Sequence, residues 1–231
     1  CIRDRETGAA RDGRRAAGGA GDFASPLTRM LLSSEGMTTT LLEAWAGRPL
    51  RPAAVVLERA RPAWWPREAQ LLGVPGDGPE LLVRRSRLVT PEGDVLSENR
   101  IVASGDVPAE LRRVMGDASA PLGPALQAAG TGFRRTLLAA GTDRWRAAAD
   151  PSSGPAADPS SAPAADPAPK GGSVPEGGSV PEGGTAPEGA PAAFKTYLLW
   201  HGEEPFAVVT EVFNPDYVPA LRARRADRGP R

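Results

Sequence analysis

A tract rich in proline, glycine and alanine interrupts the chain over residues 150–193 and constrains its fold more than any other feature. From Pro151 to Ala193, the 43 residues include ten prolines and eight glycines, contain no aromatic residue, and repeat the hexapeptide GGSVPE. Frequent proline blocks both helices and sheet ladders, and so polar a tract buries too little apolar surface to offset its ordering entropy. We therefore predict a flexible low-complexity insertion.

The insertion divides the foldable sequence into two unequal parts, residues 25–149 and 194–220. Residues 1–24 and 221–231 lack periodic hydrophobicity, and the last eleven residues hold five arginines against one acid. We predict a single domain built from both parts, of about 152 residues. We also predict a disordered N-terminal segment, a basic disordered tail and a monomeric protein.

Charge and composition exclude several classes of protein. The 28 basic and 28 acidic residues give a net charge of zero, which argues against a nucleic-acid-binding protein. One cysteine, Cys1, and one histidine, His201, allow no internal disulfide, no cysteine zinc site and no histidine-rich metal centre. No apolar run approaches the roughly 18 residues of a membrane helix. We therefore expect a cytoplasmic protein with no metal and no membrane or nucleic-acid partner.

The hydrophobic pattern of the core predicts a mixed fold. Apolar periodicity and capping signals predict helices at 26–32, 37–46, 108–115, 122–129 and 133–140. Runs rich in valine and leucine predict strands at 53–58, 81–89, 95–103, 196–200 and 206–213. Short loops at 90–94 and 201–205 join two pairs of these strands into hairpins. This arrangement is typical of the α+β class, with a single antiparallel β-sheet and flanking helices.

Glu211 interrupts the apolar run of the last predicted strand, 206–213. A carboxylate in a strand that is buried on both faces is costly unless it is paired or hydrogen-bonded, which is why such residues are often functional. The alternative is an edge strand in which Glu211 faces water. The residues alone leave both interpretations open.

Three arginines lie in the predicted strand 81–89. Alternation places Arg85 and Arg87 on one face of this strand and Arg84 on the other. An arginine in a sheet interior suits bidentate binding of a small carboxylate. The alternative is an exposed cross-strand pair between arginine and Glu98.

Four segments, 31–38, 83–102, 120–123 and 205–215, match the pieces of one enzyme family in order. They contain Glu-Gly-Met-Thr before a helix, an arginine-bearing strand followed by Asn-Arg-Ile-Val, the turn Ala-Pro-Leu-Gly, and the final strand PFAVVTEVFNP. In these segments the chain resembles the chorismate pyruvate-lyase (chorismate lyase) family, whose enzymes cleave chorismate to 4-hydroxybenzoate and pyruvate. The resemblance covers most of the core and implies a chorismate-lyase-like fold.

The resemblance also implies roles for individual residues. A count back of 15 positions from Arg100 reaches Arg85 without a gap, whereas Arg84 needs one extra residue. Arg85 therefore takes the place of the arginine that binds the ring carboxylate, and Arg100 that of the second arginine of the sheet. Glu211 takes the place of the acidic residue near the product hydroxyl. The residues whose backbone groups are expected to line the pocket are Met37 and Leu122.

The family resemblance favours an enzyme, a lyase acting on chorismate or a related aromatic carboxylate without metal or organic cofactor. Arg85 and Arg100 would hold the substrate, and Glu211 would hydrogen-bond the ring hydroxyl or transfer a proton to the leaving oxygen. Two departures from the family pattern are Ser86, where the pattern has Glu, and Arg87, where an apolar residue is usual. The alternative is a non-catalytic domain that binds a small aromatic acid, related to the effector-binding domain of GntR-type regulators.

Overall fold

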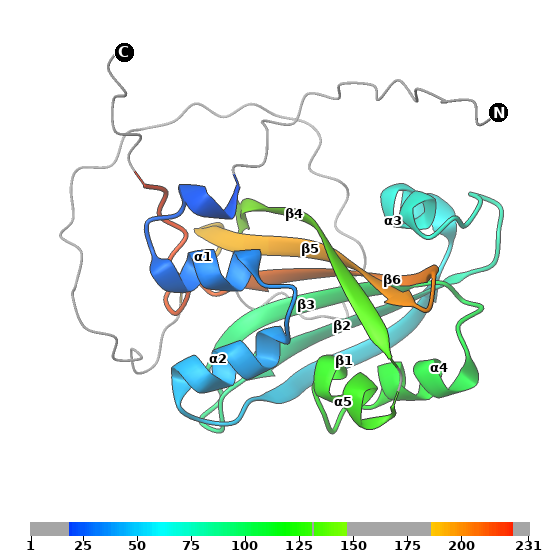
Figure 1. Ribbon diagram of the computed structural model, residues 1–231, viewed down its shortest axis with the longest axis horizontal. Helices are drawn as coiled ribbons and strands as arrows, with labels where there is room; N and C mark the ends of the chain where they lie inside the picture. The colour runs from blue at the N-terminus through cyan, green and yellow to red at the C-terminus, as the bar shows by residue number, and fades with distance from the viewer. Residues whose placement is uncertain (1–18, 131, 147–185, 224–231) are drawn as a thin grey trace, which may run out of the picture.

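The computed structural model describes residues 19–130, 132–146 and 186–223. Cys1, most of the expected insertion and most of both expected terminal segments lie outside these ranges. In the described residues, six strands form one antiparallel sheet in the order β1-β2-β3-β6-β5-β4 (Figure 1). The predicted fold class, α+β with a single antiparallel sheet and flanking helices, is confirmed.

The strands are β1 (Arg51–Ala60), β2 (Leu81–Val89), β3 (Val95–Ala103), β4 (Phe133–Arg144), β5 (Pro191–His201) and β6 (Glu204–Phe213). The α-helices are α1 (Pro26–Ser33), α2 (Thr38–Ala46), α3 (Pro66–Leu71), α4 (Ala109–Gly116) and α5 (Leu122–Ala128). Two short 3-10 helices, η1 (Ala20–Asp22) and η2 (Pro62–Trp64), complete the described elements. Among the helices of this part of the chain, none is long and apolar enough to cross a membrane.

Local sequence explains where the first helices begin and end. The side chain of Ser25 accepts a hydrogen bond of 3.3 Å from the backbone N–H of Thr28 and so caps α1, whose first residue is Pro26. Helix α2 ends at Gly47, which adopts the left-handed conformation with φ of 66°. The predicted helices α1, α2, α4 and α5 and all five predicted strands are confirmed to within a few residues.

The helix predicted at 133–140 is wrong, because these residues belong to the edge strand β4. Leu137, Leu138 and Ala140 satisfy helical spacing as readily as they satisfy a strand, so periodicity alone does not separate the two. In the structure β4 pairs with β5 along its whole length, with a register shift between Leu137 and Ala139. Tertiary pairing therefore decides this segment over local pattern.

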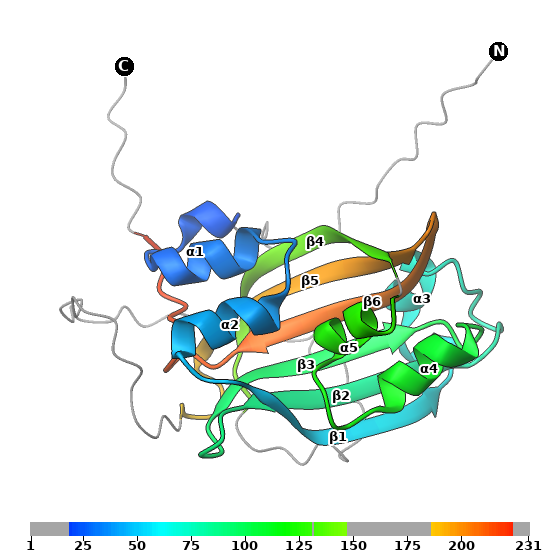
Figure 2. The same ribbon diagram turned by 60° about the horizontal axis from the view of Figure 1, so that its bottom comes forward.

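Helices cover both faces of the sheet (Figure 2). Helices α1, α2, α4 and α5 pack on the face that carries Arg84 and Glu211, which we call the front face. Trp65 with helix α3 packs on the back face, which carries Arg85 and Arg100. The interior is therefore divided by the sheet, and a one-residue change of register moves a side chain from one compartment to the other.

The two ends of the described chain are tied together. Phe23, which is fully buried, forms a β-bridge with Arg222, and Ala24 N–H donates to the carbonyl of Leu221 at 2.9 Å. Ordered structure thus extends into segments that we expected to be disordered, residues 1–24 and 221–231, wherever the structure describes them. Burial of Phe23 gives a physical reason for this difference, because it contributes to the front-face core.

Residues 147–185 connect two segments that are paired with each other. Arg144 at the end of β4 pairs with Pro191 at the start of β5, and Trp145 exchanges backbone hydrogen bonds with Gly189 and Ala190 at 2.7 and 2.8 Å. The last three residues of the predicted insertion, 191–193, therefore belong to β5. The insertion extends the connection of one hairpin and leaves the pairing of the sheet on either side in register.

Shortening this connection is expected to preserve the fold. Replacing residues 147–185 with a four-residue glycine–serine linker should raise the free energy of unfolding by about 2 kcal/mol, because a shorter loop loses less entropy on closure. Deleting one hexapeptide repeat, residues 171–176, is the matched control and should change that free energy by only about 0.2 kcal/mol. Urea denaturation measures both, and a loss of more than about 1 kcal/mol on full replacement would contradict this placement of the insertion.

Candidate functional site

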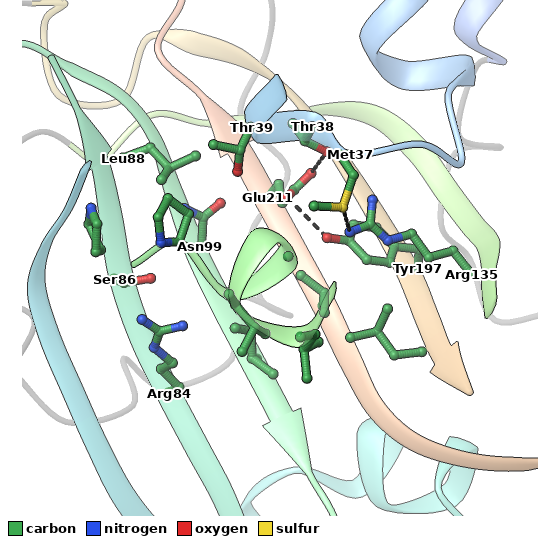
Figure 3. Close-up of a pocket in the computed structure, with 18 residues that line it drawn as sticks. Met37, Thr38, Thr39, Arg84, Ser86, Leu88, Asn99, Arg135, Tyr197 and Glu211 are labelled. Atoms are coloured by element: carbon green, nitrogen blue, oxygen red, sulfur yellow. Dashed lines mark hydrogen bonds between the residues drawn. The ribbon is translucent and has the colours of Figure 1, made fainter. Parts of the chain in front are cut away.

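A cavity lies on the front face between the sheet and helices α2 and α5 (Figure 3). Its volume is about 40 Å³, room for a few water molecules. The apolar part of its wall comes from both the sheet and α5, through Leu88, Ile101, Leu122, Leu126, Leu199 and Val209. The polar residues that line it are Thr38, Thr39, Arg84, Ser86, Asn99, Arg135, Tyr197 and Glu211. The cavity thus combines an apolar middle with polar groups at its ends.

Arg84 is the most unusual of these residues, because it is a cation that is only 1% exposed. Its Nη2 donates a hydrogen bond of 3.0 Å to the backbone carbonyl of Asp117, while its Nε has no hydrogen-bond partner. Among the described residues Arg84 forms no ion pair within 4.0 Å. Burial lowers the pKa of Arg84, and the nearby charge of Asp117 offsets this effect only in part. The fold therefore holds a buried positive charge with spare donor capacity in the cavity wall.

Glu211 lies in the cavity wall with its carboxylate already engaged. Oε2 accepts a hydrogen bond of 2.7 Å from Thr38, and Oε1 accepts one of 3.0 Å from the hydroxyl of Tyr197. Nζ of Lys195 lies 3.6 Å from Oε2. These donors stabilise the charge of a side chain that is only 9% exposed.

Lys195 connects Glu211 to the end of α1. Its side chain is 1% exposed, and its Nζ donates to the carbonyls of Leu31 and Ser34 at 3.0 and 3.3 Å. Burial lowers the pKa of Lys195, while the charge of Glu211 opposes that shift. Burial, with the charge of Glu211, raises the pKa of Tyr197 well above its usual value, so Tyr197 remains a hydrogen-bond donor.

Arg135 and Met37 lie next to each other in the cavity wall (Figure 3) and also line a second, more open hollow. Nη1 of Arg135 donates to the carbonyl of Gly36, and Nη2 lies 3.3 Å from Sδ of Met37. The guanidinium lies 5.3 Å from the ring centre of Phe133 and 5.2 Å from that of Tyr197. Like that of Arg84, the Nε of Arg135 is buried without a hydrogen-bond partner.

The structure brings three of the five predicted site residues together. Glu211, Met37 and Leu122 all line the cavity. Arg85 and Arg100 face each other across the β2–β3 pair, but on the back face. The substrate clamp expected from these two arginines and Glu211 is therefore wrong in its geometry.

The two back-face arginines have acidic partners of their own. Nη1 of Arg85 lies 3.0 Å from the carboxylate of Glu58, and Nη2 of Arg100 lies 3.6 Å from that of Glu68. Arg100 also lies over the ring of Trp65, 5.0 Å from its centre, and burial lowers its pKa. These contacts fasten the back face to β1 and α3.

Sequence reasoning missed Arg84 and Arg135 for identifiable reasons. A register shift between Leu88 and Val89 makes Arg85, rather than Arg84, the partner of Arg100, so the count back from Arg100 lands on the wrong face. The departure noted at Ser86 is the available signal, because alternation places Ser86 with Arg84 and both line the cavity. Arg135 is missed because the sequence pattern predicts a helix at 133–140, where the structure has strand β4.

No protein-family model matches this chain, and no curated protein is significantly similar to it in sequence. Solved structures with a similar fold include the C-terminal domain of histidine utilization repressor from Pseudomonas syringae, at 10% identity and a TM-score of 0.42, covering 79% of this chain and 99% of that one. The effector domain of PhnF from Mycobacterium smegmatis is 14% identical, with a TM-score of 0.44 and coverage of 79% and 91%. A ligand-binding domain assigned to a GntR-family transcriptional regulator from Bordetella bronchiseptica is also 14% identical, with a TM-score of 0.42 and coverage of 79% and 93%. At these values none of them assigns a function to this chain.

The raised pKa of Tyr197 predicts a pH dependence of stability. Above its usual pKa of about 10, an unfolded tyrosine loses its proton while the buried Tyr197 keeps it, so the folded state binds more protons and the free energy of unfolding falls as the pH rises. This group should contribute up to about 1.4 kcal/mol per pH unit. Tyr197→Phe should show a shallower fall in urea denaturation between about pH 9 and pH 11.5. Equal slopes in the two proteins would contradict the buried phenol.

Proposed function

We propose that this domain binds a small aromatic carboxylate in the front-face cavity and that Arg84 holds the carboxylate. The observation that carries the proposal is the state of Arg84, a buried guanidinium without an ion pair among the described residues and with an unused Nε–H. An isolated buried charge is strongly unfavourable, and a bound anion relieves that cost. Ser86, beside Arg84 in Figure 3, supplies a hydroxyl that can hydrogen-bond the same anion.

The other residues that line the cavity restrict the chemical class of the ligand that carries the anionic group. Ile101, Leu122 and Val209 give the cavity an apolar wall that suits a flat ring. An ionised carboxylate only accepts hydrogen bonds, so Glu211 favours a ligand with a hydroxyl or amino group at this part of the cavity. A hydroxybenzoate has all three parts, an anion, a ring and a donor.

Binding without cleavage is the reading that the contacts of Glu211 support best. Thr38, Tyr197 and Lys195 already surround its carboxylate, and Tyr197 is held protonated by burial. In all of these contacts Glu211 is the acceptor or the anion, which suits a residue that holds a ligand donor in place. Chorismate cleavage is the second candidate, supported by the presence of Arg84 and Glu211 in one cavity. In that case Arg84 would take the role expected of Arg85.

The volume of the cavity bears on how a ligand enters. An aromatic acid needs more than the 40 Å³ that is open in this arrangement, so part of the wall moves when it binds. Met37 is the side chain best suited to move, because methionine is unbranched and adapts its rotamer readily. Among the described residues, Arg135 is the one that donates a hydrogen bond to the Sδ of Met37. A thioether sulfur is a weak acceptor, so this contact holds Met37 only weakly.

Two neighbouring arginines provide a matched test of the binding site. Arg84→Gln should weaken the binding of 4-hydroxybenzoate by at least about 2 kcal/mol, roughly 30-fold, because it removes the cation that meets the carboxylate. Arg85→Gln removes the same charge one residue away on the back face and should stay within about threefold of wild type. Titration calorimetry measures both constants. A large loss in Arg85→Gln with none in Arg84→Gln would place the site on the other face of the sheet.

A coupled assay separates binding from cleavage. Lactate dehydrogenase with NADH detects pyruvate, and we expect no release from chorismate above the spontaneous rate under conditions in which 4-hydroxybenzoate binds. Glu211→Gln serves as the control, since it removes the charge of the one cavity residue expected to move a proton. Pyruvate release by the wild type that is lost in Glu211→Gln would establish the lyase in place of the binding domain.

A further inference from the structure

A second, more open hollow adjoins the cavity on its outer side. This outer groove has a volume of about 420 Å³ and is lined by Glu35, Gly36, Gln127, Gly130, Gly132 and Phe133 together with Met37 and Arg135. The last two residues line the inner cavity as well, so they form the wall between the two spaces. Displacement of Met37 would therefore join cavity and groove into one elongated site.

Arg135 is the cation of this outer groove, and the described residues satisfy its hydrogen-bonding groups and its charge only weakly. Its two described hydrogen-bond partners are a backbone carbonyl and a thioether sulfur, both uncharged, and its Nε has none. It forms no ion pair within 4.0 Å among the described residues. The rings of Phe133 and Tyr197 hold the guanidinium in place. A positioned guanidinium without a counter-ion is suited to bind an anionic group that enters the groove.

Glu35 is the acidic residue among the groove-lining residues that the structure describes. It is exposed, and its Oε1 accepts a hydrogen bond of 3.3 Å from the backbone N–H of Leu137. Salt and water screen an exposed charge more strongly than a half-buried one such as that of Arg135. The net effect of the two charges on an anion at Arg135 is therefore attractive, and Glu35 weakens it.

We propose that the outer groove is a subsite for a second anionic group, bound by Arg135, on an elongated ligand whose first carboxylate lies at Arg84. This inference rests on the proposed function, because it takes the inner cavity as the site of the ring and first carboxylate. The ligand class that follows is an aromatic acid extended by a chain with an anionic end. The chain passes the position of Met37, and the groove leaves room for it.

Ligand pairs that differ in one charge test this subsite. The probes are 4-(2-carboxyethyl)benzoate and 4-(3-carboxypropyl)benzoate, each compared with its monomethyl ester at the distal carboxylate. For the better-fitting length, we expect calorimetry to show that wild type binds the diacid about tenfold more tightly than the ester. In Arg135→Gln this preference should fall to about twofold or less. Arg134→Gln is the matched control and should keep it, because Arg134 lies on the opposite face of β4, over Trp200.

If Arg135→Gln also binds the ester poorly, the substitution has disturbed the binding site itself. Two further variants keep the test decisive in that case. Arg135→Lys retains the charge and should keep part of the preference, and Glu35→Gln should raise it about twofold by removing an opposing charge. A preference that survives loss of the Arg135 charge, or that is absent in wild type while the ester binds, would overturn the subsite and leave the inner site standing. Failure of both diacids and both esters to bind a protein that binds 4-hydroxybenzoate would overturn the subsite alone, whereas failure of 4-hydroxybenzoate to bind as well would overturn both.

Discussion

The buried pair of Lys195 and Glu211 is the interaction on which the front face depends. Lys195 reaches from β5 to the carbonyls at the end of α1, and Glu211 accepts from Thr38 at the start of α2. A cation at a helix C-terminus and an anion at a helix N-terminus both match the helix dipole. One ion pair thus positions two helix ends over the sheet, together with the cavity wall that α2 provides. Because its two charges compensate each other, the remaining cavity charge comes from arginine.

A shift of one residue along a strand decides which side of the sheet a side chain reaches. Arg84 and Arg85 are neighbours with the same side chain, yet one faces a cavity and the other forms an ion pair on the back face. What separates them is the alternation of side chains along β2, and the register shift between Leu88 and Val89 decides which of the two shares a face with Ile101. The same side chain therefore provides a buried cation in the cavity wall on one side of the sheet and ion pairs to β1 and α3 on the other.

The sequence could predict most of the fold and only part of the site, and the reason is physical. Hairpin β2–β3 and helix α2 follow from local pattern, and Glu211 was found because a carboxylate in an apolar strand needs partners. Which arginine of β2 faces the cavity depends on the register shift between Leu88 and Val89, and no local sequence pattern predicts that shift. Arg135 depends on β4, whose alternation is weak and whose strand conformation comes from pairing with β5. Local rules fail here at positions where long-range pairing decides the conformation.

The closed hairpin base at Trp145 and Ala190 has a consequence for how such a protein can change. Everything between these residues enters and leaves the domain at one point, where the two strand ends are already paired. Whole hexapeptide repeats between these residues can be gained or lost during evolution without moving any residue of the cavity. The same point is a permissive position for inserting a tether, a fluorescent reporter or a second domain, because the size of the inserted segment would not affect the pairing of the strands.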